Sequence, residues 1–360
     1  MKRLLDPDSL RALARGCAVL GAGGGGDPYL GLLQALQATE DFGPVPLVDL
    51  DELPGDALIM PCGGIGAPTV SVEKIENGDE GGRLREHLEF LTGRQVAALM
   101  AAEIGGSNGL LPICWAARMR LPVADADGMG RAFPEVPQVT MHLAGISPSP
   151  AVMTDERGNL VLFQTISGHW MERLERAAAV EFGGAASSTE FSMTVAQARD
   201  ATVRDSVSLA IRIGETIGAA ESSPVDALIA ALGAFRLITG KVLDVERRTT
   251  SGFARGSVVV EGLGADAGRL VRLELQNENL VALERGRVLA SVPDLITVLD
   301  SETADAIVTE RIAYGQRVTV IAFACDPVWR TEPGIAIAGP RAFGYEFDYL
   351  PVEELAGATA

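Results

Sequence analysis

The sequence predicts a chain of two parts: an α/β N-terminal domain with a largely parallel sheet, then a C-terminal domain with helices and a small β-sandwich or barrel. In the first half, short apolar runs alternate with helical patterns, and this alternation is typical of a parallel sheet. Between about 240 and 330, short β runs follow one another with only turns between them, which is typical of an all-β unit. A chain of 360 residues is long enough for two such domains.

We place the domain boundary so that residues 1–168 form the α/β part and residues 169–360 form the C-terminal part. The stretch "EFGGAASSTEF" at 181–191 is the most linker-like segment near this boundary, since small and polar residues dominate it. The sequence contains no low-complexity linker and no clear internal repeat. It therefore predicts two ordinary domains and not a repeat array.

Two predicted helices begin with the same Asp-Pro pair. They cover residues 6–15 ("DPDSLRALAR") and 27–38 ("DPYLGLLQALQA"), where the aspartate caps the helix and the proline suits its first turn. The runs "VPLVDL" at 45–50 and "DALIMPCG" at 56–63 have the length and composition of short buried strands.

The next segments continue the alternation. Residues 92–106 ("TGRQVAALMAAEIGG") predict a helix with a capping box at Thr92 and Gln95. Residues 111–127 predict a helix followed by a strand, and a hairpin is expected around Gly158. One or two helices are expected within 194–220.

Composition narrows the function classes. The net charge is −18 and the sequence pI about 4.6, with no cluster of Lys and Arg, so we expect neither a nucleic-acid partner nor a membrane surface. The N-terminus lacks the apolar core of a signal peptide, and no apolar run reaches the roughly 18 residues of a membrane span. No CxxC pair occurs, which argues against a zinc knuckle or a disulfide framework. These features favour a reduced, cytoplasmic protein.

The run "GAGGGGDPYLG" at 21–31 raises the question of what approaches so many glycines. Its G-x-G-x-x-G pattern satisfies the dinucleotide fingerprint, with Asp49 or Asp51 as the ribose carboxylate. Asp27 opposes this interpretation, because a carboxylate at the helix N-terminus repels a phosphate. Three interpretations stay open: a tight strand-to-helix turn capped by Asp27, a cradle for a neutral or cationic group, and a dinucleotide site. We favour the cradle, expect no nucleotide, and take as substrate-binding candidates Gly23, Gly24, Gly25, Gly26 and Asp27.

Two further glycine turns carry polar residues. Glu73 and Lys74 follow the turn that begins at "CGG", and this pair suits a catalytic base with a substrate-binding lysine, or an exposed salt bridge. Glu103 and Asn108 flank the turn in "AEIGGSNG", where their side chains could bind a polar ring. Ligands of parallel α/β sheets bind beyond the carboxyl ends of the strands, which favours a site at these turns.

The segment "VADADGMGRAFPE" at 123–135 is the richest in candidate residues. Asp125 and Asp127 are two apart, so a strand would direct both carboxylates to one side, as a general-base pair or a metal pair requires. His142 is the candidate third metal ligand, and Arg131 is a candidate for substrate binding. The structural alternatives are capping aspartates in a loop and a histidine held in the core.

Five motifs together resemble one known family. They are "AVLGAGGGGDPYLG", "GAPTVSVEK", "EIGGSNG", "ADADGMGRAFPE" and "GPRAFGYEFDY". In combination they resemble the DUF917 family, also called the S-methyl thiohydantoin desulfurase domain family, over nearly the whole chain. The resemblance implies an α/β N-terminal domain and a C-terminal domain with a β portion. It also implies removal of sulfur from a five-membered thiohydantoin ring, and a related member acts on a thiohydantoin propionate and is associated with zinc.

The expected chemistry is attack of an activated water on the ring carbon that carries sulfur, which yields a hydantoin. A general base or a divalent metal, zinc by the resemblance, would activate the water. The candidates are Asp125, Asp127 and Glu73 as base and His142 with the two aspartates as metal ligands, although the sequence lacks a histidine cluster.

The resemblance also bears on partners. Family members are often encoded with hydantoinase/oxoprolinase-type proteins, so we expect a small heterocyclic substrate, hydantoinase-type partners and a homo-oligomer. The alternatives are a non-catalytic, ring-binding accessory subunit of such an assembly and a nucleotide-dependent enzyme.

Overall fold

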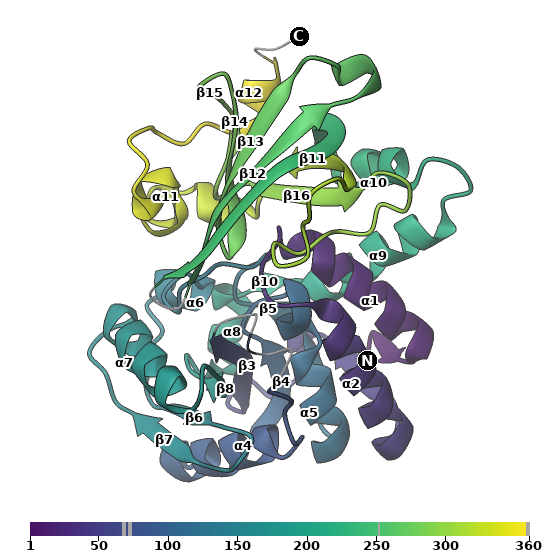
Figure 1. Ribbon diagram of the computed structural model, residues 1–360. Coiled ribbons are helices and arrows are strands. Elements are labelled where there is room, and N and C mark those ends of the chain that lie inside the picture. Colours follow the sequence, from purple (N-terminus) through teal and green to yellow (C-terminus); the bar gives the residue numbers. More distant parts are fainter. Residues whose placement is uncertain (67–69, 71–73, 251–252, 358–360) are drawn as a thin grey trace.

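The computed structural model describes residues 1–66, 70, 74–250 and 253–357. Figure 1 shows two lobes stacked on one another, with an α/β lobe below and an antiparallel sheet above. The predicted fold class is therefore confirmed. None of the helices within these ranges is long and apolar enough to cross a membrane.

The first sheet is mixed, with a parallel centre. Its strands are β1 (Arg3–Leu5), β2 (Val45–Val48), β3 (Leu58–Gly66), β4 (Val96–Ala101), β5 (Val123–Asp127), β6 (Ala151–Thr154), β7 (Leu160–Phe163), β8 (Ala185–Thr189), β9 (Met193–Thr194) and β10 (Val203–Arg204). In the described part of the chain their order is β1-β2-β5-β4-β3-β8-β6-β7, with β10 paired to β5 and β9 to β3. The pairs β2–β5, β5–β4 and β4–β3 are parallel, as the alternation of strands and helices predicts.

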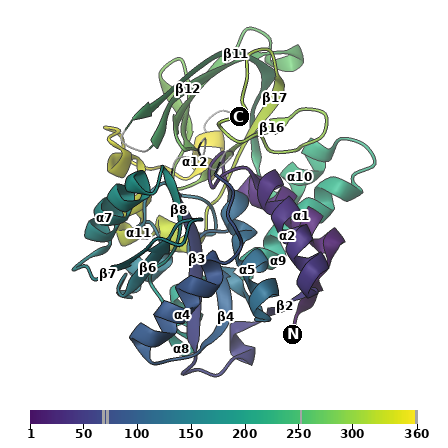
Figure 2. The same ribbon diagram turned by 60° about the horizontal axis from the view of Figure 1, so that its bottom comes forward.

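Helices surround this sheet. They are α1 (Pro7–Leu20), α2 (Pro28–Phe42), α4 (Glu80–Thr92), α5 (Leu111–Met119), α6 (Thr140–Leu143), α7 (Gly168–Glu181), α8 (Val195–Ala201) and α9 (Ser206–Ala219). In Figure 1 and Figure 2, α1, α2 and α9 lie at one end of the lobe, and α7 lies with β6 and β7 at the other. The Asp-Pro prediction is confirmed, because Asp6 and Asp27 accept hydrogen bonds from the backbone N–H groups of Ser9 (2.8 Å) and Tyr29 (3.0 Å).

Two local predictions are wrong. Residues 92–106 do not form a helix: Thr92 ends α4, and the apolar run that follows is β4, a central strand. A short apolar run buried on both faces of a parallel sheet has no strand-like alternation, so pattern alone cannot separate it from a buried helix. The linker-like segment 181–191 contains β8, which pairs with β3 and β6. The small residues of this segment therefore lie within the sheet and do not form a linker.

The upper lobe is one curled antiparallel sheet. Its strands are β11 (Phe235–Thr250), β12 (Phe253–Gly262), β13 (Leu270–Gln276), β14 (Glu278–Glu284), β15 (Arg287–Ser291), β16 (Leu295–Asp300) and β17 (Arg317–Phe323), and its helices are α10 (Pro224–Leu232), α11 (Glu332–Ala338) and α12 (Val352–Gly357). The strand order is β15-β14-β13-β12-β11-β17-β16. Because β14 also contacts β16, the sheet curls toward closure around its own apolar core. This lobe is the predicted β portion.

The glycine run joins the two lobes. Asn279 of β14 donates hydrogen bonds from its Nδ2 to the carbonyl oxygens of Ala22 and Ile296, each at 2.9 Å. The backbone N–H of Thr309 donates to the carbonyl oxygen of Gly23 at 2.9 Å. A Cβ at Gly23 would lie 2.9 Å from Asn279 Nδ2, so the close approach of the upper lobe requires glycine there.

The first prediction concerns the packing of α1 on α9. A Cβ at Gly16 would lie 1.8 Å from the carbonyl oxygen of Ala210, so Gly16→Ala must push the two helices apart. We expect the free energy of unfolding to fall by about 1–3 kcal/mol, although alanine is the better helix former. Urea denaturation monitored by circular dichroism measures it.

Gly82→Ala in α4 is the matched control, because a Cβ there meets nothing within 4 Å. We expect this variant to be as stable as the wild type or more stable by up to about 1 kcal/mol. Equal effects of the two substitutions would contradict the proposed role of the α1–α9 contact.

Candidate functional site

A cavity of about 400 Å³ opens in the α/β lobe beside the joint with the upper sheet. Its size lies in the range of pockets that hold small molecules. The polar residues that line it are Asp27, Gln34, Lys74, Glu76, Glu80, Glu103, Ser107, Asn108, Glu135, Thr154, Asp155, Glu156, Arg176, Ser187, Ser188, Glu190, Asn277 and Glu278. Six sequence candidates are among all lining residues: Gly25, Gly26, Asp27, Lys74, Glu103 and Asn108.

Glu103 follows the carboxyl end of β4, where a parallel sheet places its ligands. Its side chain is 8% exposed. Asn108 Nδ2 donates to Glu103 Oε1 at 2.5 Å, and the backbone N–H of Phe133 donates to Oε2 at 3.2 Å. Burial nevertheless raises the pKa of Glu103 to about 8, because desolvation outweighs these two hydrogen bonds.

Asn108 connects Glu103 to the next strand. Its Oδ1 accepts a hydrogen bond from the backbone N–H of Gly64 at 3.0 Å. Gly64 on β3 pairs with Ser187 on β8, and the Ser187 hydroxyl donates to Glu76 Oε1 at 2.6 Å. Burial raises the pKa of Glu76 to about 7. A continuous path of contacts therefore runs along the cavity wall between two carboxyl groups with near-neutral pKa values.

Two more carboxyl groups line the cavity, and one oxygen of each accepts no hydrogen bond from the described residues. Glu278 comes from β14 of the upper lobe and is 2% exposed, and burial together with the Glu103 carboxylate raises its pKa well above the usual range. Glu190 follows β8, and burial raises its pKa to about 7. The Oε2 atom of each has no hydrogen-bond partner among the described residues.

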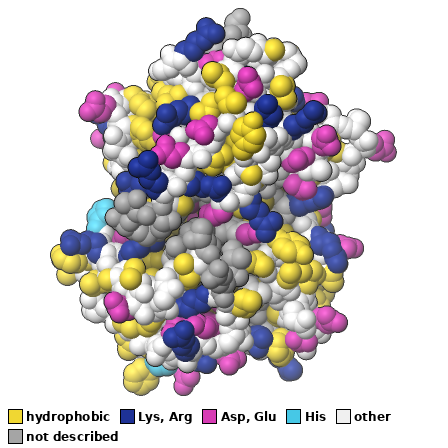
Figure 3. All heavy atoms as spheres, in the orientation of Figure 1, with side chains coloured by type: hydrophobic (Ala, Val, Ile, Leu, Met, Phe, Trp, Pro, Cys, Tyr) yellow, Lys and Arg dark blue, Asp and Glu magenta, His cyan; other side chains and the backbone are white. Residues whose placement is uncertain are grey.

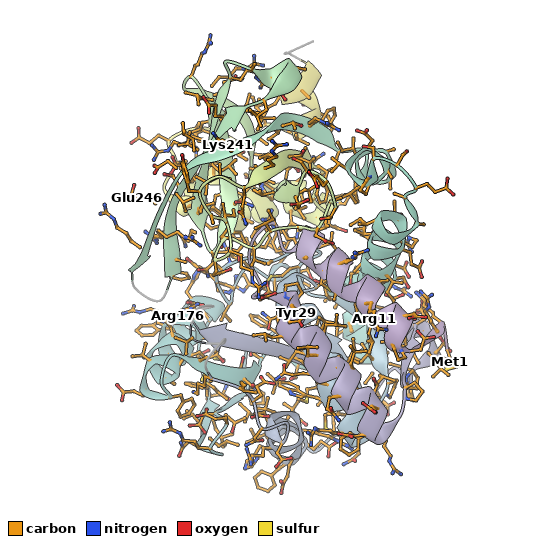
Figure 4. The ribbon with its side chains drawn as sticks, turned by 45° about the vertical axis from the view of Figure 1, so that its right-hand side comes forward. Met1, Arg11, Tyr29, Arg176, Lys241 and Glu246 are labelled. Atoms are coloured by element: carbon orange, nitrogen blue, oxygen red, sulfur yellow. The ribbon has the colours of Figure 1, made fainter. Side chains whose placement is uncertain are left out.

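The cations of the cavity already have partners. Lys74 Nζ lies 3.0 Å from Glu156 Oε2 and donates to the carbonyl oxygen of Ala185 at 2.6 Å. Arg176 Nε donates to Glu172 Oε1 at 2.7 Å. In Figure 4 Arg176 lies below the end of the β11–β12 hairpin, and its guanidinium carbon is 4.5 Å from the centre of the Phe253 ring. The described lining contains many more carboxyl groups than cations, and both cations, Lys74 and Arg176, already have an acidic partner.

The glycine run has a different environment at each end. Gly25 and Gly26 line the cavity, whereas Gly23 and Gly24 pack against the upper lobe, where a Cβ on Gly24 would lie 2.0 Å from Glu278 Oε1. The run links α1 to α2, so the alternative of a strand-to-helix turn is wrong about the strand, whereas its Asp27 cap is present. The dinucleotide fingerprint needs a preceding strand, and that context is missing here. Asp27 caps α2 and also pairs with Arg311.

Asp125 and Asp127 face the protein interior and do not line the cavity. Asp125 accepts hydrogen bonds from the backbone N–H and hydroxyl of Ser208, at 3.0 and 2.5 Å, and from Lys2 Nζ at 3.0 Å. Asp127 Oδ2 accepts from three backbone N–H groups, including that of Ile104 at 2.8 Å. Burial raises the pKa of Asp127 to about 7. Asp125 therefore fixes the start of α9 and the N-terminal segment, and Asp127 fixes the loops that follow β4 and β5.

The candidate zinc ligands do not assemble. His142 lies in the short helix α6 and not in a strand, and its ring faces those of His169 and Phe191 at 6.1 and 6.3 Å. In the parts of the chain that the structure describes, no three His, Cys, Asp or Glu residues are placed to hold a metal ion. Donors occupy the Asp125 carboxylate and Oδ2 of Asp127, whereas Oδ1 of Asp127 has no hydrogen-bond partner among the described residues. Since His142 is not grouped with the two aspartates, this set does not fit zinc.

Two other candidates have different positions. Glu73 lies outside the described residues. Arg131 is fully buried at the joint, where its guanidinium donates to the carbonyl oxygen of Asp294 at 3.0 Å and stacks 4.3 Å from the Phe133 ring. Arg131 connects the two lobes and is not part of the cavity lining.

Five lining residues are not among the site residues predicted from the sequence: Glu76, Ser187, Ser188, Glu190 and Glu278. Four of them lie in or beside segments that looked like loop or linker. The Ala-Ala-Ser-Ser run of β8 is the signal that could have identified part of the site, because small residues let a strand approach a ligand closely. Glu278 gave no sequence signal, since only the folded joint brings it to the cavity.

The second prediction uses the pKa of Glu103. Folding raises it from an ordinary value of 4.5 to about 8, so the folded protein binds an extra proton in this window and loses stability as pH rises through it. Glu103→Gln removes this dependence. We expect the free energy of unfolding of the variant, relative to that of the wild type, to increase between pH 5 and pH 8. The increase is at most about 1.4 kcal/mol per pH unit. Urea unfolding at several pH values measures it, and a constant difference would contradict the raised pKa.

On the face shown in Figure 3, basic and acidic side chains are interspersed over both lobes. The absence of a nucleic-acid partner stays a prediction.

Comparison with known proteins places the chain in a family. The sequence model of the S-Me-THD-like N-terminal domain matches residues 8–165, and that of the S-Me-THD-like C-terminal domain matches residues 166–352. A crystal structure of a protein from Chromobacterium violaceum has the same fold, with a TM-score of 0.80 and 24% identity over 97% of this chain and 100% of that one. A comparison with curated proteins gives no match. Since the two domain models together match nearly the whole chain, the protein belongs to the S-Me-THD-like family.

Proposed function

We propose that the protein hydrolyses an S-methyl thiohydantoin, or a thiohydantoin, to the hydantoin. The observation that carries the proposal is the pair Glu76 and Glu103, a half-buried and a buried carboxyl group on the wall of one small-molecule cavity, whose pKa values are raised to about 7 and about 8. Pairs of carboxyl groups whose pKa values the protein raises toward neutrality can supply acid and base chemistry at one site. Membership of the family supports the choice of substrate.

The reaction needs one base and one acid. In its ionised form Glu76 takes a proton from water as the water oxygen bonds to the ring carbon that carries sulfur. In its protonated form Glu103 donates a proton to the sulfur as the carbon–sulfur bond breaks. From an S-methyl ring the products are methanethiol and the hydantoin, which forms as its hydroxy tautomer. From an unmethylated ring the proton of that new hydroxyl group goes to sulfur, and hydrogen sulfide leaves. One water is consumed, and proton exchange with solvent returns Glu76 to its ionised form and Glu103 to its protonated form.

The cavity wall supplies orientation. Asn108 is fixed at both ends, to Glu103 and to the Gly64 backbone, so the carboxyl group of Glu103 has a defined direction. Gly63 and Gly64 present backbone without side chains, which lets a flat ring lie against β3. A ring held in this way reacts from one geometry, and proximity lowers the barrier.

The third prediction is the loss of activity in Glu103→Gln. The amide keeps the shape of the side chain but cannot donate an acidic proton, so we expect kcat to fall by about 10²- to 10⁴-fold. Methanethiol release with a thiol reagent, and hydantoin formation by chromatography, measure it over a panel of S-methyl thiohydantoins. Glu181→Gln at the exposed end of α7 is the control for a lost carboxylate and should retain wild-type activity.

Two outcomes would overturn the assignment. Full activity in Glu103→Gln would remove Glu103 as the acid. Hydantoin binding with no release from any ring would favour the ring-binding accessory subunit over the enzyme. The same assay with a chelator tests the zinc expectation, since loss of release would require a metal that the described residues do not explain.

The fourth prediction is the pH profile. Glu76 must be ionised and Glu103 protonated, so kcat/KM should rise as pH approaches about 7 and fall above about 8. Glu76→Gln should remove the dependence on the acid side together with most of the rate. Initial rates between pH 5 and 10 measure the profile, and a rate that keeps rising beyond pH 9 would rule out a carboxylic acid as the proton donor.

A further inference from the structure

We propose that the tip of the β13–β14 hairpin, Asn277 with Glu278, binds the ring carbonyl oxygen of the substrate through two hydrogen bonds. This carbonyl lies beside the ring nitrogen that is bonded to the sulfur-bearing carbon, and neither Glu76 nor Glu103 is assigned to it above. The identity of the ring rests on the proposed function. The carbonyl-binding pair rests on the position, burial and hydrogen bonds of Asn277 and Glu278.

The β13–β14 hairpin brings its tip to the cavity of the other lobe. Gln276 pairs with Glu278 across the hairpin, and Asn277 forms the turn between them. Asn277 has a φ of 58°, in the left-handed region that asparagine adopts more readily than most residues. The hairpin belongs to the upper sheet, yet both Asn277 and Glu278 line the cavity. Two adjacent polar side chains of the upper lobe can therefore reach a ligand held by the lower lobe.

The side-chain amide of Asn277 has a fixed orientation. Its Oδ1 accepts a hydrogen bond from the backbone N–H of Ala254 at 2.9 Å, and only the oxygen of an amide can accept from an N–H donor. The backbone is held as well, since Asn277 N–H donates to the Ala254 carbonyl oxygen at 2.8 Å and the Thr309 hydroxyl donates to the Asn277 carbonyl oxygen at 2.6 Å. Nδ2 has no hydrogen-bond partner among the described residues, so its N–H groups are free to donate to a ligand.

Glu278 supplies the second donor. Its side chain is 2% exposed, and its Oε2 has no hydrogen-bond partner in the described part of the chain. Burial raises the pKa of Glu278 well above the usual range, and the Glu103 carboxylate adds to this effect. The Arg131 guanidinium opposes it, but Arg131 donates its hydrogen bonds to backbone carbonyl oxygens, including those of Ala132 and Asp294. The balance favours a protonated carboxyl group, whose O–H needs an acceptor.

Gly24 determines where this carboxyl group can lie. A Cβ on Gly24 would lie 2.0 Å from Glu278 Oε1 and 2.5 Å from Glu278 Cδ, so the glycine leaves room for the carboxyl group itself. The φ of Gly24 is outside the left-handed region, so its backbone conformation does not require glycine. The requirement for glycine at this position therefore comes from Glu278.

Two donors at the carbonyl oxygen match the chemistry of an S-methyl ring. As the water oxygen bonds to the sulfur-bearing carbon, the electron pair of its C=N bond moves to the ring nitrogen and is shared with the adjacent carbonyl oxygen. The pair returns to form C=N again when the carbon–sulfur bond breaks. Hydrogen bonds to the carbonyl oxygen stabilise the negative charge while it is present. A protonated carboxyl group can serve as such a donor at neutral pH.

The position relative to Glu103 agrees with this assignment. The sulfur-bearing carbon and the carbonyl carbon flank one nitrogen of a five-membered ring, so the groups that contact the sulfur and the carbonyl oxygen must be neighbours. Glu103, the proposed acid at the sulfur, is close enough to Glu278 for its charge to disfavour ionisation of Glu278.

The test compares two rings that carry no sulfur and therefore do not react. Hydantoin has the carbonyl in question, and imidazolidin-2-one lacks it. Isothermal titration calorimetry at pH 7 gives the Kd of each ring. We expect the wild type to bind hydantoin about 5- to 100-fold more tightly than imidazolidin-2-one, as two hydrogen bonds imply. A ratio near 1 in the wild type would overturn the proposal.

Variants locate the two donors. Asn277→Asp keeps an oxygen for the Ala254 N–H and replaces only the free Nδ2, so hydantoin should bind no more tightly than imidazolidin-2-one. Glu278→Gln still has an N–H donor and should keep the wild-type ratio to within about threefold, whereas Glu278→Met has none and should lower the ratio. A ratio lost equally in Glu278→Gln and Glu278→Met would show that a donor is not what Glu278 supplies. An unchanged ratio in Asn277→Asp and Glu278→Met, with both rings bound more weakly, would assign the two residues a structural role only.

Gly24→Ala displaces the Glu278 carboxyl group without removing it. We expect this variant to lower the ratio as Glu278→Met does. Gly82→Ala is the matched control, because a Cβ at Gly82 meets nothing within 4 Å, and it should keep the wild-type ratio. Equal ratios in the two glycine variants would contradict the role of Gly24.

Methanethiol release separates this proposal from the proposed function. If the variants change the ratio as expected but the wild type releases no methanethiol from any ring, the carbonyl-binding pair is established and hydrolysis fails. If the wild type releases methanethiol but its ratio is near 1, hydrolysis is retained and the pair is overturned. If neither ring binds, the pair is overturned whatever the activity.

Discussion

The seating of the upper sheet on the glycine run is the contact on which the rest of this structure depends. Asn279 is bonded to the backbone of Ala22, and Gly23 and Gly24 leave room for the side chains of β14. One consequence is structural, because segments that are far apart in the sequence meet there and join the two lobes. The other is chemical, because Glu278 enters the cavity of the other lobe. The upper lobe of the protein packs against Gly23 and Gly24. Only Gly25 and Gly26, at the end of the run, line the cavity.

Burial then sets the chemistry of the cavity. Its unpaired carboxyl groups are held by serine, asparagine and backbone donors, and no lysine or arginine described here forms an ion pair with Glu76, Glu103, Glu190 or Glu278. Hydrogen bonds from neutral donors do not offset the desolvation of a carboxylate, so these pKa values rise toward neutrality. The proposed proton transfer at the ring depends on this arrangement.

Much of the fold could be predicted from the sequence because its signals are local. The Asp-Pro caps set the starts of α1 and α2, and the spacing of turns after about 240 indicated an antiparallel β portion. The prediction failed where context decides. The buried run of β4 resembles a helix, and the Ala-Ala-Ser-Ser run of β8 resembles a linker until β3 and β6 flank it.

The site was predictable only in part, for a related reason. Glu103 and Asn108 follow a parallel strand directly, and position alone places them at the cavity. Asp125 and Asp127 satisfy the same rule, but Ser208 binds the Asp125 carboxylate, and backbone N–H groups of neighbouring loops bind Oδ2 of Asp127. Whether a carboxyl group binds a ligand or holds a loop depends on donors distant in sequence, which no local pattern contains.

The central claim is that Glu103 stays protonated near neutral pH inside this cavity. Carbon-13 NMR of protein labelled at the glutamate carboxyl carbons, titrated from pH 5 to pH 10 for the wild type and Glu103→Gln, tests it directly. We expect one carboxyl resonance that titrates at about 8 and disappears in the variant. A wild-type spectrum in which the Glu103 resonance titrates below about 6 would contradict the account.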